Sequence, residues 1–188
     1  MNDKTKIITS YLRLYKEKGQ KITMDDIAKD LSISKKTIYT IFKSKEDMFE
    51  QMINYCFDQL DDLQQTIVTD HTLSPVVKLS KLLYNIADFY SPNFSLSKVS
   101  YPEINTLFTK RVDKIWKTLL LVITDGQEDG IFKTVNPVII RCIFEASLAK
   151  FYSDDFSKSV AIKPADAITE AIDTIVRGIT IKNTSNYI

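Results

Sequence analysis

The sequence of 188 residues contains little cysteine or histidine. Its two cysteines, Cys56 and Cys142, lie far apart in apolar stretches, and His71 is its single histidine. These residues lack the spacing of metal ligands, so we expect no metal site. Free cysteine is among the most frequently buried residue types, and we therefore expect two buried, reduced thiols.

Glycine, proline and long apolar runs are also scarce. Four glycines and five prolines are too few for the many tight turns of an all-β fold. The longest apolar run, residues 119–123, is far shorter than the roughly 20 residues of a membrane-spanning helix. The first residues also lack the apolar segment of a signal peptide. We therefore expect a soluble, cytoplasmic protein with no membrane partner.

Neither sign of charge dominates the chain as a whole. There are 25 Lys and Arg residues against 24 Asp and Glu residues, a formal charge of +1. A nucleic-acid site must therefore come from local charge. Residues 29–45 contain five lysines and one acid, a local charge of +4, whereas residues 51–188 contain 14 basic and 16 acidic residues. Positive charge is thus concentrated near the N-terminus.

What the sequence does contain is apolar spacing of three to four residues, typical of amphipathic helices, over most of its length. The pattern predicts an all-α fold with about nine helices in total, divided into domains at residues 1–48 and 49–188. The first helix is expected to end at Lys18, with Gly19 as its left-handed cap. Later helices are expected to begin at or just after Thr23, Ser34, Ser44, Ser74, Pro102, Asn136 and Pro164.

The three short helices predicted in the first 42 residues have the plan of a helix-turn-helix motif. Lys35 and Lys36 follow the capping Ser34, in the first turn of the third helix, where the helix dipole disfavours cations. Cations at this position make sense if phosphates or base edges approach them. Two solvated lysines with a small energetic penalty are the alternative interpretation.

Residues 22–49 resemble the DNA-binding domain of the tetracycline-repressor (TetR) family. The matching features are T-x-x-x-I-A from Thr23, S-x-x-T-[LI]-Y-x-x-F from Ser34, and F-x-S-K-E-x-[LM] from Phe42. The sequence departs from the family at Ser32, where glycine is usual, and at Lys36, where a small residue is frequent. We expect Ser32 to adopt a left-handed backbone at a cost of about 1 kcal/mol, and Lys36 to alter base preference.

The resemblance implies a DNA-binding transcriptional regulator whose third helix reads the major groove of double-stranded DNA. The lysines at the start of that helix would reach base edges and flanking phosphates. Tyr39 would donate its hydroxyl to a phosphate, although a half-buried aromatic is the alternative, and Lys45 would hold a phosphate at a helix N-terminus. The DNA contacts implied in this way are Thr23, Lys35, Lys36, Thr37, Tyr39, Lys43 and Lys45.

Beyond residue 50 the sequence is similar to the family in outline. The resemblance implies a homodimer formed through the last two helices, about residues 137–152 and 165–179, whose apolar stripes are otherwise ordinary core. It also implies a small apolar or aromatic effector that binds among the long helices and releases the repressor from DNA. The aromatic candidates for the ligand site, each by default a core residue, are Phe57, Tyr84, Phe89, Tyr90, Phe108, Trp116, Phe144 and Tyr152.

Two other classes of function are alternatives to a DNA-binding regulator. An enzyme is disfavoured because the sequence has no phosphate-binding loop, dinucleotide fingerprint or nucleophile elbow, and we expect no catalytic residue and no cofactor. A helical ligand- or protein-binding module without DNA binding is the second alternative. Binding to duplex DNA that weakens steeply with salt distinguishes a repressor from both.

Overall fold

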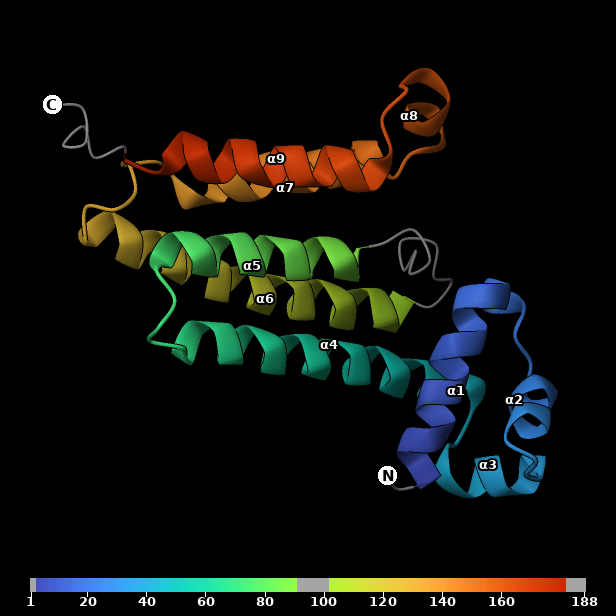
Figure 1. The fold of residues 1–188 in the computed structure, drawn as a ribbon. Helices are drawn as coiled ribbons and strands as arrows, with labels where there is room; N and C mark the ends of the chain where they lie inside the picture. Colours follow the sequence, from blue (N-terminus) through green and yellow to red (C-terminus); the bar gives the residue numbers. More distant parts are fainter. Residues whose placement is uncertain (1–2, 91–101, 182–188) are drawn as a thin grey trace, which may run out of the picture. The chain divides into compact units, whose positions relative to one another are not determined.

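The computed structural model describes residues 3–90 and 102–181 (Figure 1). These residues form nine α-helices, and the predicted all-α fold is confirmed. Within the described ranges, β-structure is limited to one isolated bridge between Phe132 and Thr180. The helices are α1 (Asp3–Lys18), α2 (Met24–Asp30), α3 (Lys35–Ile41), α4 (Lys45–Thr69), α5 (Pro75–Phe89), α6 (Pro102–Glu128), α7 (Pro137–Phe151), α8 (Asp154–Ser159) and α9 (Pro164–Ile179), with a 3-10 turn η1 (Gly19–Lys21) after α1.

The helix boundaries follow the capping signals of the sequence. Ser74 caps α5 by accepting a hydrogen bond from the Val77 amide, and Asn136 caps α7 in the same way through the Val138 amide. Both helices, like α9, begin with proline, whose fixed φ suits the first helical position. Gly19 has a φ of +59°, the left-handed conformation expected after α1.

The sequence did not predict α8. Ser153 caps this six-residue helix by accepting a hydrogen bond from the Phe156 amide. So short a helix contains too few apolar positions to show a period, so its formation depends on the packing of Phe156, which is buried. The irregular connection expected over residues 91–100 lies outside the described residues.

The chain divides into two compact units, and the division falls within α4 and within α6. The first unit comprises Met1–Leu60 and Asn93–Arg111, and the second comprises Asp61–Pro92 and Val112–Ile188. The sequence-based boundary at residues 48 and 49 lies near the start of α4 and stays a prediction.

The core of the first unit joins α1 to its neighbours. Tyr11 and Tyr15 of α1 pack against Phe49, with ring centroids 6.3 and 5.2 Å away. Ile27 of α2 and Ile38 of α3 have no exposed surface. These contacts hold three short helices, which would not be stable alone, in one arrangement.

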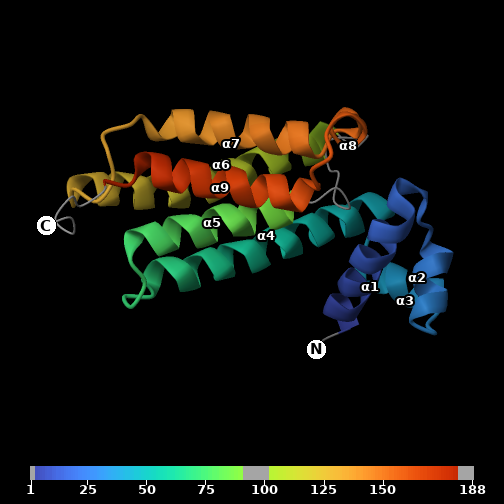
Figure 2. The same ribbon diagram turned by 45° about the horizontal axis from the view of Figure 1, so that its top comes forward.

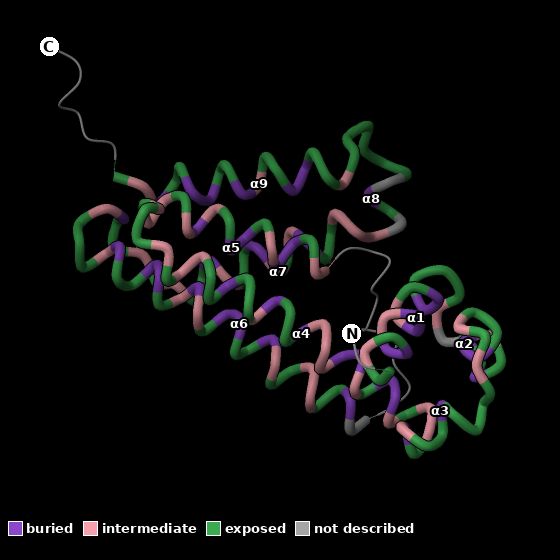
Figure 3. Tube along the Cα trace, turned by 60° about the horizontal axis from the view of Figure 1, so that its bottom comes forward, coloured by how far each residue is buried: buried purple, intermediate pink, exposed green. Residues whose placement is uncertain are grey.

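In the second unit, α9 packs along both α5 and α7 (Figures 1 and 2). Figure 3 shows the buried residues of α9 on the side that faces these helices and exposed residues on the other side. The buried stripe of α9 consists of Ala167, Ile168, Ile172, Ile175, Val176 and Ile179. None of the helices in the described residues is long and apolar enough to span a bilayer.

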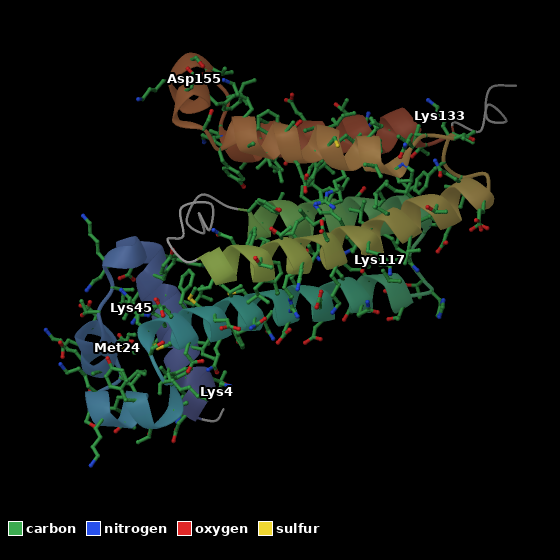
Figure 4. The ribbon with its side chains drawn as sticks, turned by 180° about the vertical axis from the view of Figure 1, so that it is seen from behind. Lys4, Met24, Lys45, Lys117, Lys133 and Asp155 are labelled. Carbon is green, nitrogen blue, oxygen red and sulfur yellow. The ribbon has the colours of Figure 1, made fainter. Side chains whose placement is uncertain are left out.

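The segment after α6 is tied to the end of α9. The amides of Ile131 and Phe132 both donate to the Gly126 carbonyl at 2.8 Å, which turns the chain tightly over α6. The Lys133 amide then donates to the Ile179 carbonyl at 2.7 Å, and the Lys133 ammonium donates to the Gly178 carbonyl at 2.8 Å (Figure 4). Carbonyls at the end of α9, which have no partner within the helix, are satisfied in this way.

Candidate nucleic-acid interface

The start of α2 is fixed by a reciprocal capping box. The Thr23 side chain accepts a hydrogen bond from the Asp26 amide at 3.2 Å, and the Asp26 carboxylate accepts one from the Thr23 amide at 2.8 Å. Lys18 of α1 donates to the same carboxylate at 2.6 Å. Hydrogen bonds from Lys18 and Thr23 hold the pKa of Asp26 well below its usual value, so this link between α1 and α2 is ionised at neutral pH.

A second link between α1 and α2 uses Asp30. Its carboxylate accepts a hydrogen bond from Ser10 at 2.6 Å and is paired with Arg13, both residues of α1. The hydrogen bond from Ser10, followed by that from Arg13, lowers the pKa of Asp30. The two ends of α2 are therefore each held to α1 by a carboxylate.

The turn between α2 and α3 depends on Ser32. Its φ is +53°, so the left-handed backbone expected from the sequence is confirmed. This conformation lets the Ile33 amide donate to the Ala28 carbonyl at 2.9 Å and the Ser32 amide donate to the Lys29 carbonyl at 3.3 Å. The end of α2 is thereby satisfied and the chain is directed into α3.

Helix α3 is anchored on one side and exposed on the other. Ile38 and the following Phe42 have no exposed surface. Tyr39 is 51% exposed, so its hydroxyl can reach a phosphate, and the alternative of a half-buried aromatic stays open. The exposed residues of α3 are Lys35, Lys36, Thr37, Tyr39 and Thr40.

The first turn of α3 has a capping contact and an ion pair. Ser34 accepts a hydrogen bond from the Thr37 amide at 3.0 Å, and its hydroxyl lies 2.9 Å from the Thr37 hydroxyl. Lys35 pairs with Asp25 of α2 at 3.0 Å, a contact that the sequence analysis missed. The sequence gives no sign of this pair, because a ten-residue separation across a turn carries no periodic signal. Among the described residues, Lys36 has no such partner.

The start of α4 adds a second cluster of polar groups. Ser44 accepts a hydrogen bond from the Asp47 amide at 3.1 Å, and the Asp47 carboxylate accepts one from the Lys43 amide at 2.7 Å. Hydrogen bonds from Gln51 and then from the Lys43 amide lower the pKa of Asp47. Lys45 occupies the first position of α4 and is partly buried (Figure 4).

Taken together, the first unit presents an exposed helix with cations at its N-terminal end. The predicted contacts Thr23, Lys35, Lys36, Thr37, Tyr39 and Lys43 are exposed, and Lys45 is partly buried. A helix of this kind fits the major groove of duplex DNA, where lysine and threonine reach phosphates and base edges. The role of each residue in DNA contact stays a prediction.

The candidate ligand-site aromatics are divided between the two units. In the first unit, Phe57 and Phe108 pack edge to face with centroids 5.4 Å apart. In the second unit, Trp116 and Phe144 pack edge to face at 6.1 Å, and neither has any exposed surface. Tyr84 is 38% exposed on α5 and does not join this interior.

The other aromatic candidates in the second unit are partly buried. The rings of Phe89 and Tyr90 have centroids 6.2 Å apart, and the Tyr152 hydroxyl donates to the Ala87 carbonyl at 3.3 Å. Burial raises the pKa of Tyr90 to about 12, so this phenol is neutral at physiological pH. In the described part of the chain, no group of three or more His, Cys, Asp or Glu side chains is placed to hold a metal ion.

Helix α7 differs from α9 in having an exposed apolar face. Val138, Ile139 and Ile143 are each about half exposed, at 51, 53 and 48%. Cys142 lies among them and is exposed, so the prediction of two buried thiols is wrong for this residue. The spacing of the sequence identified apolar residues on α7, but it did not distinguish those that the chain covers from those that it leaves in solvent.

Comparison with known proteins supports the interpretation of the first unit. Residues 7–52 match the family model described as bacterial regulatory proteins, tetR family. The chain is 21% identical over 180 residues to YvaF of Bacillus subtilis, an uncharacterized HTH-type transcriptional regulator, covering 93% of this chain and 94% of that protein. It is 43% identical over 61 residues, about a third of each chain, to IcaR of Staphylococcus aureus, a negative transcriptional regulator of the biofilm operon icaADBC.

Solved structures share the whole fold. A transcriptional regulator of Saccharomonospora viridis in complex with choline has a TM-score of 0.78 and 19% identity, covering 95% of this chain and 98% of that chain. The regulator FadR of Bacillus subtilis in complex with stearoyl-CoA has a TM-score of 0.69 and 17% identity, covering 93 and 98%. At 17–19% identity, this similarity shows a shared fold and nothing more.

Proposed function

Because the chain belongs to the TetR family of bacterial transcriptional regulators, we propose that it is a repressor that binds a two-fold symmetric operator as a homodimer and is released by a small effector. The family is one of regulators and not of enzymes. The observation that carries the proposal is the exposed helix α3, with Lys35, Lys36 and Tyr39 facing solvent. IcaR, which is similar over the DNA-binding region, is a negative regulator.

The way in which α3 is anchored determines which of its residues can contact DNA. The buried Ile38 fixes the rotation of the helix, so Lys36 and Thr37 at its N-terminal end project away from the unit. Lysine in this position donates to guanine O6 and N7 or to phosphate oxygens. Lys35 can exchange Asp25, whose side chain is 74% exposed, for a phosphate at little cost, because an exposed ion pair is weak.

Dimerisation is the second part of the proposal, through α7 and α9, the helices predicted from residues 137–152 and 165–179. The exposed apolar face of α7, formed by Val138, Ile139, Cys142 and Ile143, supports α7 as the centre of the contact. A contiguous apolar face on a helix surface is typical of a protein interface. A single short recognition helix binds weakly, whereas a dimer offers two of them to successive major grooves.

Effector binding is the third part. Two regulators with the same fold are known in complexes with small molecules, choline in one and stearoyl-CoA in the other. The second unit of this chain has an aromatic interior that includes Trp116 and Phe144. A ligand bound there releases DNA if it favours a subunit arrangement in which the two recognition helices no longer match the grooves.

Selection of bound duplexes from a random pool tests the proposal. We expect a two-fold symmetric site with half-sites about one helical turn apart and an affinity that falls steeply with salt. Recovery of no enriched site, or of binding that does not depend on salt, contradicts DNA reading and favours a helical ligand-binding module. A single unpaired half-site contradicts the dimer.

Two lysine variants separate base reading from backbone contact. We expect Lys36→Ala to lower the discrimination between operator and single-base mismatches by about 1–3 kcal/mol at the position it reads. We expect Lys45→Ala to weaken binding to all duplexes similarly and to reduce the salt slope by about 1. Fluorescence anisotropy with labelled duplexes measures both effects.

Lys117→Ala is the matched control, because Lys117 is exposed on α6 in the second unit (Figure 4). It should leave affinity and salt slope unchanged. If Lys36→Ala and Lys45→Ala behave alike, the division of roles between the two lysines is wrong.

A further inference from the structure

The N-terminal end of α1 carries a lysine in line with residues that are buried farther along the helix. Ile8 and Tyr11 are buried on one side of α1, and the Tyr11 ring packs against Phe49 of α4. Lys4 precedes Ile8 by four residues and Tyr11 by seven, so it lies on the same side of the helix, one to two turns earlier. Lys4 is nevertheless exposed (Figure 4). The side of α1 that faces α4 therefore ends in a solvent-exposed cation.

Lys4 lies close to the first turn of α4. The pKa of Asp47 in that turn is lowered mainly by its hydrogen bonds with Gln51 and with the Lys43 amide. The positive charges of Lys43 and Lys4 lower this pKa further, which agrees with the position of Lys4 on the α4 side of α1. Two lysines from separate elements thus come together at the start of α4.

The carboxylates nearby do not neutralise these two lysines. Lys4 and Lys43 are both exposed, and within the described residues neither ammonium group forms an ion pair. Asp3, the acid next to Lys4 in the sequence, is paired with Lys6 at 3.4 Å. Asp47 supplies one negative charge for two positive charges. A net positive charge therefore remains in solvent at this place, which favours the approach of an anion.

The two lysines lie at the C-terminal end of the recognition helix. Helix α3 ends at Ile41, two residues before Lys43, and Figures 1 and 4 show the N-terminal end of α1 at the same edge of the first unit as α3. Lys35 and Lys36 lie at the other end of α3, about 10 Å away at a rise of about 1.5 Å per residue. The major groove is about 12 Å wide and has phosphates along both edges. Cations at both ends of α3 are therefore placed to meet phosphates.

We propose that Lys4 binds a phosphate of the operator backbone at the C-terminal end of α3, beside the phosphate contact predicted for Lys43. The lysine ammonium is a flexible point charge that donates to phosphate oxygens without reading a base. This contact extends the DNA-binding surface from residues 22–49 to the first turn of α1. The inference rests on the proposed function, because it takes α3 as the helix that enters the major groove.

Titration of the full chain with a labelled operator duplex at several salt concentrations tests the contact. We expect Lys4→Gln, which removes the charge, to reduce the salt slope by about 1 and to weaken binding to matched and mismatched duplexes by the same factor. Lys4→Arg keeps the charge and should keep the wild-type slope. Weaker binding by Lys4→Gln with an unchanged slope would assign a structural role to Lys4 and overturn the inference.

Lys16→Gln is the matched control, because Lys16 is another exposed lysine of α1. It lies about 18 Å from Lys4 along the helix axis, away from the start of α4. We expect this substitution to leave the affinity and the salt slope unchanged. If Lys16→Gln and Lys4→Gln reduce the slope equally, the effect comes from the net charge of the protein and not from a local contact, and the inference is wrong.

Operator duplexes in which an uncharged methylphosphonate replaces one phosphate at a time locate the contact. At the phosphate that Lys4 binds, we expect wild type and Lys4→Gln to bind equally, because the neutral group no longer attracts the ammonium. At the other positions wild type should bind more tightly, and a difference that persists at every position overturns the inference. Absence of operator binding by wild type would sink the proposed function together with the inference. Operator binding that Lys4→Gln reproduces in affinity and slope would sink the inference alone.

Discussion

Ser32 adopts a strained backbone conformation that the turn of the helix-turn-helix motif requires. Its backbone has a φ of +53°, a region that residues with a Cβ rarely adopt. The conformation is kept because it lets the Ile33 amide reach the Ala28 carbonyl and directs the chain from α2 into α3. The strain is therefore located at the turn that positions the recognition helix, where glycine would avoid it.

Substitution of Ser32 by glycine should stabilise the protein. We expect Ser32→Gly to raise the free energy of unfolding by about 1 kcal/mol, because glycine adopts a positive φ without a steric cost. Ser32→Ala retains the Cβ and should change stability by less than about 0.5 kcal/mol. Urea denaturation followed by circular dichroism measures both. Equal stabilisation by the two substitutions would show that the serine hydroxyl, and not the backbone, is the source of the cost.

At the scale of single elements, α7 and α9 both carry apolar residues at helical spacing, but the chain covers these residues to different extents. The apolar residues of α9 are covered by α5 and α7, whereas α7 buries Ile140, Phe144 and Leu148 and leaves Ile139 and Ile143 exposed. An exposed apolar face beside a buried one is typical of a surface that another molecule covers. This division supports α7 as the dimer contact.

The end of α6 depends on a close contact at Gly126. A Cβ at this position would lie 2.3 Å from a ring carbon of the buried Phe132, so Gly126→Ala should lower the free energy of unfolding by about 1–3 kcal/mol. Gly178→Ala on α9 is the control, because an added Cβ there would meet no described atom within 4 Å beyond its chain neighbours and the adjacent backbone of α9. It should stabilise by about 0.5–1 kcal/mol, the usual gain of alanine within a helix. Thermal unfolding of both variants checks the pair, and destabilisation by Gly178→Ala as large as that by Gly126→Ala would contradict the contact argument.

At the scale of the whole molecule, the proposed function requires two copies of the chain. A dimer closed over the α7 face would remove apolar surface from water and present two copies of α3 to one DNA duplex. Cys142 lies on the exposed face of α7, so the rate at which its thiol is alkylated reports whether this face is covered. The second cysteine, Cys56, is partly buried, and burial raises its pKa to about 11, so its thiol reacts slowly at neutral pH.

Alkylation of the two cysteines therefore tests the interface. We expect iodoacetamide to modify Cys142 about tenfold more slowly at protein concentrations where the dimer forms, because a closed interface excludes the reagent. Ile139→Asp should give a monomer in light scattering and restore fast modification. Cys56 should stay slow in both proteins and serves as the internal control. A dimer in which Cys142 reacts as fast as in Ile139→Asp would show that α7 is not the contact.

Much of the fold was predictable from the sequence because its signals are local. Caps at Ser34, Ser74 and Asn136, and the stop at Gly19, depend on residues within one helical turn. The same holds for the motif over residues 22–49 and for the cluster of lysines in it. The short helix α8 was missed because six residues are too few to show a hydrophobic period.

The sequence by itself thus determined the helices other than α8 and the helix-turn-helix motif, since each follows from neighbouring residues. The left-handed backbone at Ser32 was expected from the glycine that is usual there in the family that the sequence resembles. Only the tertiary structure decided that Lys35 pairs with Asp25, that Cys142 is exposed and that Gln64 is buried. Burial and pairing depend on which surfaces of distant helices meet, and helical periodicity marks an apolar face without naming what covers it.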